Sequence, residues 1–396
     1  ATKYVALALK SRAMLYAGSV AKYGTVSLNG IVGISASEAN KYWQASFDAS
    51  EQVINAKKFS LYNKNPDKEL NFAQSFLDND NPEAIFSVYY QYPYKTHSYD
   101  ASNLPFGIRG HGGSGSNIGP SLEMVEQYEY TDGSAGKLKI RNPDGSPVLY
   151  NKTTDLFLNK DPRCLATVIV PFGQCAGKVV DVQAGIYDRN VKVEAGDYSA
   201  LYNPVTHKPD NVNGTLHIVG LSGFGGAEST QTGFYLRKYL DPSLAQTAAI
   251  GGASDQPWIV FRYAEILLNY AEASFELDKE PAAKDAVNQV RERAGIKLLT
   301  DAEVTLSRIR NERMVELAFE NHRWWDYRRW RIADKVLNNT RLTALKGYFD
   351  VQANAYRFET GVAGRWPKTF DPKVYYERID PAEIAKNPKL VQTPGY

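Results

Sequence analysis

The segment 312–330, ERMVELAFENHRWWDYRRW, constrains the fold of this chain more than any other stretch. Glu312, Glu316 and Glu320 recur at every fourth position, which places them on one face of a helix. Four arginines lie close enough in sequence to pair with these carboxylates: Arg313, Arg323, Arg328 and Arg329. Three tryptophans add large apolar side chains: Trp324, Trp325 and Trp330. The pattern predicts a helix packed against other helices, with its tryptophans buried and its ions paired, and it is not a catalytic signature.

Helical periodicity occurs on both sides of a long irregular stretch. Apolar residues at helical spacing predict helices at 1–24 and 37–59, and the periodicity returns between 257 and 340. Helix pairs of this length resemble tetratricopeptide-type repeats, which stack because no single pair can bury its own apolar face. We therefore expect a mostly α protein built on tetratricopeptide-like helical repeats.

Capping and proline signals place several helix ends. Pro281 is suited to the first turn of a helix, and Thr300 with Glu303 forms a capping box that opens the next one. A last helix is expected from about 323 to 338. In the middle of the chain, a helix is expected over 120–130 with a proline in its first turn.

The stretch 61–256 differs from its surroundings, since Pro, Gly, Asn and Asp become frequent and helical periodicity fades. Short strands are predicted there at 84–90, 165–171 and 232–239. The chain thus divides into four expected regions: a helical repeat remnant at 1–60, an irregular ligand-binding insertion at 61–256, tetratricopeptide-like helix pairs at 257–340, and an irregular, proline-containing C-terminal wrap at 341–396. Long loops on a rigid scaffold commonly carry function, so the insertion is where we expect the site.

Composition excludes several classes of function. The chain has 46 basic and 44 acidic residues, which leaves no electrostatic footprint for nucleic acid or an anionic membrane. No stretch is apolar for long enough to form a transmembrane helix. Cys164 and Cys175 fit either a disulfide or two buried free thiols, and they form no metal-ligand pattern with five scattered histidines. We expect no metal and no cofactor.

The candidate binding site is a run of aromatic residues in the insertion. Its members are tyrosines with one histidine among them and one arginine shortly after: Tyr90, Tyr92, Tyr94, His97, Tyr99 and Arg109. A sugar ring stacks its C–H face on an aromatic ring, while its hydroxyls need polar partners. Because side chains alternate in a strand, Tyr90, Tyr92 and Tyr94 could project from one face as a stacking platform. The competing interpretation is that Tyr89 and Tyr90 only close the core of the preceding strand.

Several segments together resemble the SusD/RagB family, the surface glycan-binding lipoproteins of Bacteroidetes. The run from Glu312 to Trp330 resembles the C-terminal signature of that family, and only Asn321 departs clearly, since the family pattern has Gly there. Further segments resemble other family landmarks in the same order: Thr232–Tyr239, Ile259–Ala273, Ala286–Gly295 and the ending Asn387–Tyr396. The resemblance covers nearly the whole chain.

The resemblance implies a function and a location. It implies non-catalytic binding of an oligosaccharide at the extracellular face of the outer membrane, with delivery to a TonB-dependent, SusC-like transporter over which the protein sits. The family also implies an N-terminal region with a lipid-anchored Cys, which this sequence lacks, so a membrane link would run only through that anchor. The binding aromatics of the family lie partly in the insertion and partly in that region.

Three other functions remain open from the residues alone. A peptide ligand fits the same family, but it would call for polar and charged pockets instead of stacked aromatics. A glycoside hydrolase needs two carboxylates facing each other across a cleft, and the insertion shows no such pair in an apolar setting. A purely structural scaffold is the remaining alternative.

Overall fold

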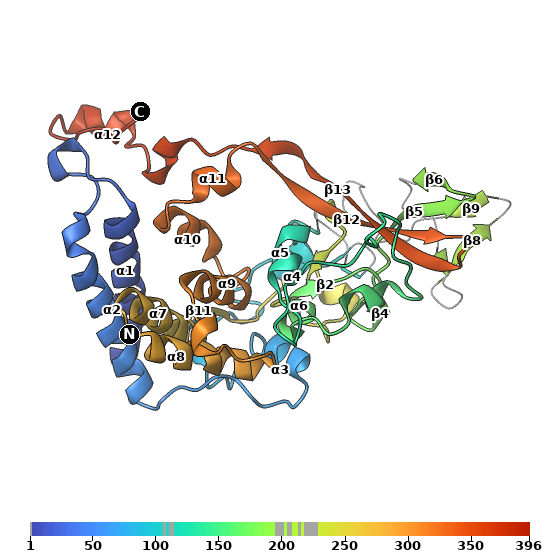
Figure 1. The fold of residues 1–396 in the computed structure, drawn as a ribbon, viewed down its shortest axis with the longest axis horizontal. Coiled ribbons are helices and arrows are strands. Elements are labelled where there is room, and N and C mark those ends of the chain that lie inside the picture. The colour runs from blue at the N-terminus through green and yellow to red at the C-terminus, as the bar shows by residue number, and fades with distance from the viewer. Residues whose placement is uncertain are drawn as a thin grey trace.

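The computed structural model describes residues 2–105, 108–110, 115–194, 202–203, 208–212, 215–217 and 229–396. Helices α1 and α2 near the N-terminus and α12 near the C-terminus lie at one side of the molecule, and the sheet that contains β5 and β6 lies at the other (Figure 1). The α-helices are α1 (Lys3–Tyr23), α2 (Ala39–Asn55), α3 (Lys68–Gln74), α4 (Tyr99–Asn103), α5 (Leu122–Gln127), α6 (Pro162–Thr167), α7 (Tyr263–Glu276), α8 (Glu280–Ala294), α9 (Leu306–Glu316), α10 (Arg323–Arg329), α11 (Ala333–Leu337) and α12 (Pro381–Lys386).

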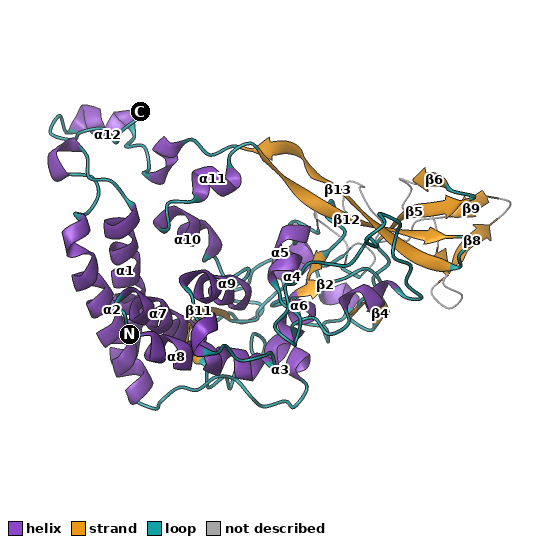
Figure 2. Ribbon diagram, viewed as in Figure 1, coloured by secondary structure: helices purple, strands orange, loops and turns teal. Residues whose placement is uncertain are grey.

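Strands alternate with loops through the middle of the chain and dominate one stretch near its end (Figure 2). They are β1 (Ala84–Val88), β2 (Val168–Ile169), β3 (Gln174–Cys175), β4 (Lys178–Val179), β5 (Gln183–Asp188), β6 (Val191–Glu194), β7 (Tyr202–Asn203), β8 (Lys208–Val212), β9 (Thr215–His217), β10 (Tyr235–Leu236), β11 (Trp258–Arg262), β12 (Thr340–Asp350) and β13 (Ala355–Lys368).

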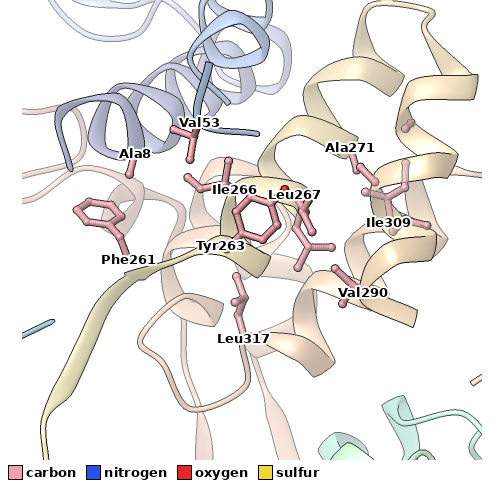
Figure 3. Packing of buried hydrophobic residues seen from close by; sticks show 14 of the residues in the cluster. Ala8, Val53, Phe261, Tyr263, Ile266, Leu267, Ala271, Val290, Ile309 and Leu317 are labelled. Carbon is pink, nitrogen blue, oxygen red and sulfur yellow. The ribbon is translucent and has the colours of Figure 1, made fainter. Parts of the chain in front are cut away.

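The four long helices form the scaffold. Helix α1 packs on α2, α2 on α7, and α7 on α8. Their shared core is apolar and fully enclosed, and Figure 3 shows side chains from α1, α2, β11, α7, α8 and α9 converging there: Ala8, Val53, Phe261, Ile266, Leu267, Val290 and Ile309. Helices within 1–24 and 37–59 are therefore confirmed. The return to helices after residue 257 is confirmed only from Tyr263 onwards, because Trp258–Arg262, including Ile259 of the expected helical face, form strand β11. The description of these helices as tetratricopeptide repeats stays a prediction.

The local signals that end the helices are only partly those expected. Pro281 lies in the first turn of α8, as predicted, and Gly295 ends that helix in a left-handed conformation with φ 76°. The Thr300–Glu303 capping box is present, but it begins a short 3₁₀ helix, and Thr305 is the N-cap of α9 instead. The helix expected over 120–130 is shorter, because Ser121 is its N-cap and Pro120 lies outside it.

The C-terminal segment is not irregular throughout, as the sequence had suggested. Strands β12 and β13 form a long antiparallel hairpin, and β12 also pairs in parallel with β5 from the insertion. With β6 these strands make a four-stranded sheet in the order β13-β12-β5-β6. One face covers a second core, in which Leu345 and Phe358 of the hairpin contact α5, α6 and Val315 of α9. Pro367 lies within β13, and the later prolines, from Pro372 onwards, follow the hairpin.

A buried ion network joins the insertion to the helices. Glu316, fully buried at the end of α9, accepts hydrogen bonds from Arg163 at 2.8 Å, from Arg262 at 2.6 Å and from Arg293. Burial alone would raise the pKa of Glu316, but the three guanidinium groups hold it well below its usual value. The carboxylate therefore stays ionised inside the protein.

The prediction that Glu312, Glu316 and Glu320 are paired is confirmed, but the predicted partners are wrong. Their cations come from other elements: Arg163, Lys238, Arg262, Arg291 and Arg293. Helix α9 ends at Glu316, so Glu320 lies in the turn before α10 and not on the same helix. Trp330 is buried as expected, whereas Trp324 and Trp325 remain 42% and 49% exposed.

The expected helix over 323–338 is broken into α10 and α11. Cys164 and Cys175 are both buried free thiols, which decides between the two alternatives that the sequence left open. Among the described residues, no helix has the length and apolarity to cross a membrane.

Candidate functional site

A cavity of about 550 Å³, here called the first cavity, opens beside the aromatic run. Its walls carry aromatic rings and uncharged polar groups: Tyr90, His97, Ser98, Tyr99, Ser102, Asn103, Ile118, Tyr239, Gln256, Pro257, Trp258, Phe319 and Asn321. They come from the insertion, from the start of β11 and from the turn between α9 and α10. The cavity therefore lies where the insertion meets the helical scaffold.

Strand pairing brings the two main aromatic groups together. Strand β1 runs antiparallel to β11, and Val88 at the end of β1 faces Trp258 at the start of β11. Tyr90 lies two residues beyond Val88, and this spacing places it on the same side as Trp258. A second link lies just beyond, where His97 and Ser254 exchange backbone hydrogen bonds of 2.9 Å. These pairings hold the aromatic run against the segment that precedes β11.

His97 is fixed by hydrogen bonds on both ring nitrogens. Its Nδ1 accepts from the backbone N–H of Tyr99 at 3.2 Å, which leaves the proton on Nε2 to be donated to the carbonyl of Gln256 at 3.0 Å. The Tyr90 ring packs edge-on against His97, with ring centroids 4.6 Å apart. His97 therefore serves to hold the wall of the cavity, and neither nitrogen is free to act as a base.

The deeper wall is a stack of aromatic rings. Trp258 lies almost parallel to Tyr239 with centroids 4.6 Å apart, and Tyr99 contacts both of them edge-on or tilted at 6.1 and 6.3 Å. Burial raises the pKa of Tyr99 and of Tyr239 well above the usual value, so both phenols keep their protons. Asn103 donates from its amide to the carbonyl of Tyr99 at 2.9 Å and fixes the start of this wall.

The six residues singled out from the sequence do not form one group. Tyr90, His97 and Tyr99 line the first cavity. Tyr92 and Tyr94 lie on a tight turn closed by reciprocal backbone hydrogen bonds between Gln91 and Lys95, and their side chains are 61% and 86% exposed. The prediction that Tyr90, Tyr92 and Tyr94 project from one face of a strand is therefore wrong.

Arg109, the sixth of these residues, is buried and is absent from the cavity lining. Its carbonyl accepts a hydrogen bond of 3.1 Å from the amide of Gln246. This arginine stands apart from the other five.

Sequence reasoning missed most of the lining that lies far from the tyrosine run. Trp258 reaches the cavity through the pairing of β1 with β11, and Tyr239 and Gln256 contact each other beside it. Phe319 and Asn321 reach the cavity through the turn after α9. The φ angles of Phe319 and Asn321 are 61° and 66°, in the left-handed region that residues other than glycine rarely adopt. An aromatic residue flanked by proline, as in Gln256-Pro257-Trp258, was the signal available in the sequence.

The lining has no acidic residue and no thiol, so the part of the cavity that the structure describes carries no carboxylate pair for hydrolysis. The described residues also contain no cluster of three or more acidic, His or Cys side chains that could hold a metal ion. What the geometry offers is a set of flat apolar faces with hydroxyl and amide groups between them. Such a surface suits a ligand with both apolar faces and hydroxyls.

Comparison with known proteins agrees with this architecture. A SusD-like protein of Formosa agariphila is 36% identical over 90 residues, which is 20% of this chain and 18% of that protein. A SusD-like protein from Bacteroides fragilis NCTC 9343 superposes with a TM-score of 0.67 at 22% identity and covers 100% of this chain. A SusD-like carbohydrate-binding protein from the same strain superposes with a TM-score of 0.60 at 21% identity over 95% of this chain, which is 68% of that protein.

The chain spans only 65% of the length of the first Bacteroides fragilis structure. The likeness to these structures establishes the fold. The sequence profile of the SusD family matches residues 72–396, the greater part of the chain and all of the helical signature after α8. The chain therefore belongs to the SusD family.

Proposed function

We propose that this protein binds an oligosaccharide without cleaving it, and that the first cavity holds one sugar ring of the ligand. The observation that carries the proposal is the aromatic wall of Tyr90, Tyr99 and Trp258 beside the amides and hydroxyls of the lining. Aromatic faces stack on the C–H face of a pyranose, and the polar groups between them accept and donate hydrogen bonds to its hydroxyls. The carbohydrate-binding relative from Bacteroides fragilis supports this choice of ligand.

The exposed turn beside the cavity extends the proposed site. The backbone N–H of Tyr92 lies 3.4 Å from the carboxylate of Asp255, next to Gln256 of the cavity wall. Tyr92 and Tyr94 can therefore stack on further sugar units of a chain whose end occupies the cavity. Arg109 belongs to the sequence-based candidates, but its position favours a supporting role for the segment behind the cavity.

The affinity expected from such a site is modest. Each stacking ring contributes on the order of 1 kcal/mol. After the cost of association, a few such contacts leave dissociation constants in the range of about micromolar to millimolar. Weak, reversible capture is compatible with passing the ligand on. We accordingly propose delivery to a TonB-dependent, SusC-like transporter at the extracellular face of the outer membrane, a role that rests on the family alone.

The experiment is isothermal calorimetry of the protein against a panel of plant and host polysaccharides and their oligosaccharides, with release of reducing sugar followed in the same samples. We expect saturable binding to one glycan and no release. Trp258→Ala should weaken that binding by about tenfold or more, because it removes the ring that closes the cavity wall. Trp366→Ala is a matched control, since Trp366 is 75% exposed on β13 and is absent from the cavity lining.

Two further variants test the turn separately from the cavity. Tyr92→Ala and Tyr94→Ala should weaken binding of longer oligosaccharides while leaving a mono- or disaccharide unaffected. Release of sugar in step with enzyme concentration would replace the proposal with a glycoside hydrolase. Binding of peptides in place of glycans would replace the proposal with peptide binding at the same cavity.

A further inference from the structure

A second cavity, of about 950 Å³, borders the same turn between α9 and α10. We call it the tryptophan cavity, because Trp324 and Trp325 of α10 line it together with Met124 and Met314. Both tryptophans keep nearly half of their surface exposed. Large aromatic side chains that are left open to solvent inside a concavity are typical of ligand sites.

The charged side chains of the tryptophan cavity differ in their partners, and its carboxylate is already hydrogen-bonded. Glu123 accepts a hydrogen bond of 2.8 Å from the backbone N–H of Thr343. Burial alone would raise the pKa of Glu123, but hydrogen bonds from Thr343 and Ser121 lower it below its usual value. This carboxylate is therefore ionised and already satisfied by β12 and the cap of α5.

Neither of the two cations, Arg323 and Lys368, has a carboxylate partner among the described residues, although Arg323 lies over the ring of Tyr327 at 5.2 Å. Among the described residues, the side-chain hydrogen bonds of Arg323 run only to the sulfur atoms of Met314 and Met124, the latter at 3.1 Å. A thioether is a weak acceptor, so most of the hydrogen-bonding capacity of the guanidinium is unused. Lys368, at the end of β13, is exposed, and its side-chain ammonium has no hydrogen bond or ion pair to any residue that the structure describes.

The two cavities meet at one turn. Phe319 and Asn321 line both of them, and the side-chain amide of Asn321 makes no hydrogen bond within the described residues. Both residues hold left-handed backbone angles, which cost free energy and are concentrated at ligand sites in known proteins. A ligand that crosses this turn would have its ends in the two cavities and its middle beside the amide.

From this geometry we infer that the tryptophan cavity is a second saccharide subsite, selective for sugars that carry a negative charge, a carboxylate or a sulfate ester. Trp324 and Trp325 supply stacking faces, while Arg323 and Lys368 supply the counter-charge. A guanidinium matches the geometry of either anion with paired hydrogen bonds. The inference rests on the proposed function, and it specifies the ligand as an acidic oligosaccharide that spans both cavities.

The test uses pairs of oligosaccharides that differ only in charge. One pair is oligogalacturonate and its methyl ester, and the other is a sulfated galacto-oligosaccharide and its desulfated form. We expect the charged member of at least one pair to bind about tenfold tighter than its neutral partner at low salt, and the advantage to shrink as salt rises. The pair that shows the effect identifies the anion.

Arg323→Gln and Lys368→Gln should abolish the advantage of the charged ligand over its neutral partner. Lys335→Gln is the matched control, because it removes the same charge from the exposed surface of α11 outside the cavity lining. Equal affinity for both members of each pair, or an equal loss in the Lys335 variant, would overturn the charged subsite while leaving neutral binding at the first cavity intact. Absence of binding to all four ligands would overturn the charged subsite, whereas the proposed function fails only if the polysaccharide panel also shows no binding.

Discussion

At the scale of single residues, the protein is organised around charges that have left water. Arg163 is fully buried, and it satisfies Asp161, Glu312 and Glu316 at once. Taking such groups out of water costs several kcal/mol for each ion, which their mutual attraction repays only if every partner is in place. Removing any one charge of the network should therefore lower the free energy of unfolding.

Glu316→Gln tests this dependence. The substitution keeps the shape of the side chain but leaves Arg163, Arg262 and Arg293 short of a shared negative charge. We expect the free energy of unfolding to fall by about 3–5 kcal/mol, measured by urea denaturation. Glu383→Gln in α12, where the glutamate is 58% exposed, should change it by less than about 1 kcal/mol. Similar losses in both variants would contradict the special cost of the buried charge.

His322 makes stability depend on pH. Burial lowers its pKa well below the usual value, and Arg313 lowers it further, so the folded protein keeps the ring neutral. The unfolded chain takes up a proton below about pH 6.5. The folded state therefore gains its full advantage above that pH and loses it as the pH falls towards 5, at up to about 1.4 kcal/mol per pH unit.

His322→Asn should remove this dependence, because its amide oxygen can accept the hydrogen bond that Arg313 directs to Nδ1 and does not titrate. Urea denaturation at pH 7, 6 and 5 measures the slope. Asp181, whose pKa burial raises to about 7, gives a slope of the opposite sign in the same interval, so His322 is assigned from the difference between the slopes of the two proteins, in which Asp181 cancels. Parallel curves for the two proteins would show that His322 is not the titrating group.

At the scale of elements, the packing of α1 on α2 rests on one close approach. A methyl group at Gly18 would lie 2.6 Å from the ring of Trp43, which is fully buried and has no room to withdraw. Alanine is favoured over glycine inside a helix by up to about 1 kcal/mol. The sign of the measured change therefore tells which effect is larger.

We expect Gly18→Ala to destabilise the protein by about 1–3 kcal/mol despite its better helix propensity, because the clash strains a packed core. Thermal unfolding followed by circular dichroism measures the change. Combining it with Trp43→Phe should cost less than the sum of the two single changes, since the smaller ring makes room. A stabilised Gly18→Ala protein would show that the helices separate freely.

The elements also show where sequence patterns suffice. The long helices α1, α2, α7 and α8 follow from apolar spacing, because each presents a continuous stripe to its neighbours. The β12–β13 hairpin does not follow from local patterns, because the prolines from Pro367 onwards favour an irregular C-terminal segment. A strand pattern is nevertheless present in the sequence, because Tyr356 and Phe358 alternate with polar residues. Both aromatic side chains are buried. The pairing of the hairpin with β5 depends on chain that lies far away in sequence and is invisible to local patterns.

At the scale of the whole molecule, the insertion and the helical scaffold share their interior. Val315 of α9 belongs to the same apolar cluster as Leu345 of the hairpin, and Arg163 of α6 joins the charges of α9. Neither part can open without exposing groups of the other. The two parts should therefore lose structure together.

Hydrogen exchange under increasing urea tests this coupling. We expect backbone amides of α7 and of β12 to become exchangeable over the same range of denaturant, as for one cooperative unit. Arg163→Met should separate the two, with β12 exchanging first, because the variant removes the ion that links insertion and scaffold. Early exchange of β12 in the unaltered protein would show that the hairpin is an independent unit.

What the sequence determined by itself was the helical scaffold, the burial of its charged signature and the family to which the chain belongs. The scaffold and the charged signature follow from residues close together in the chain, where spacing alone sets which side chains share a face, and the family follows from several such segments in a fixed order. The cavity walls were decided by tertiary structure, since Tyr90 meets Trp258 only through the register of β1 and β11. The same holds for the cations that reach Glu316 and for the turn that exposes Tyr92 and Tyr94. Contacts between distant segments depend on which strands pair and in what register, and no local pattern encodes that choice.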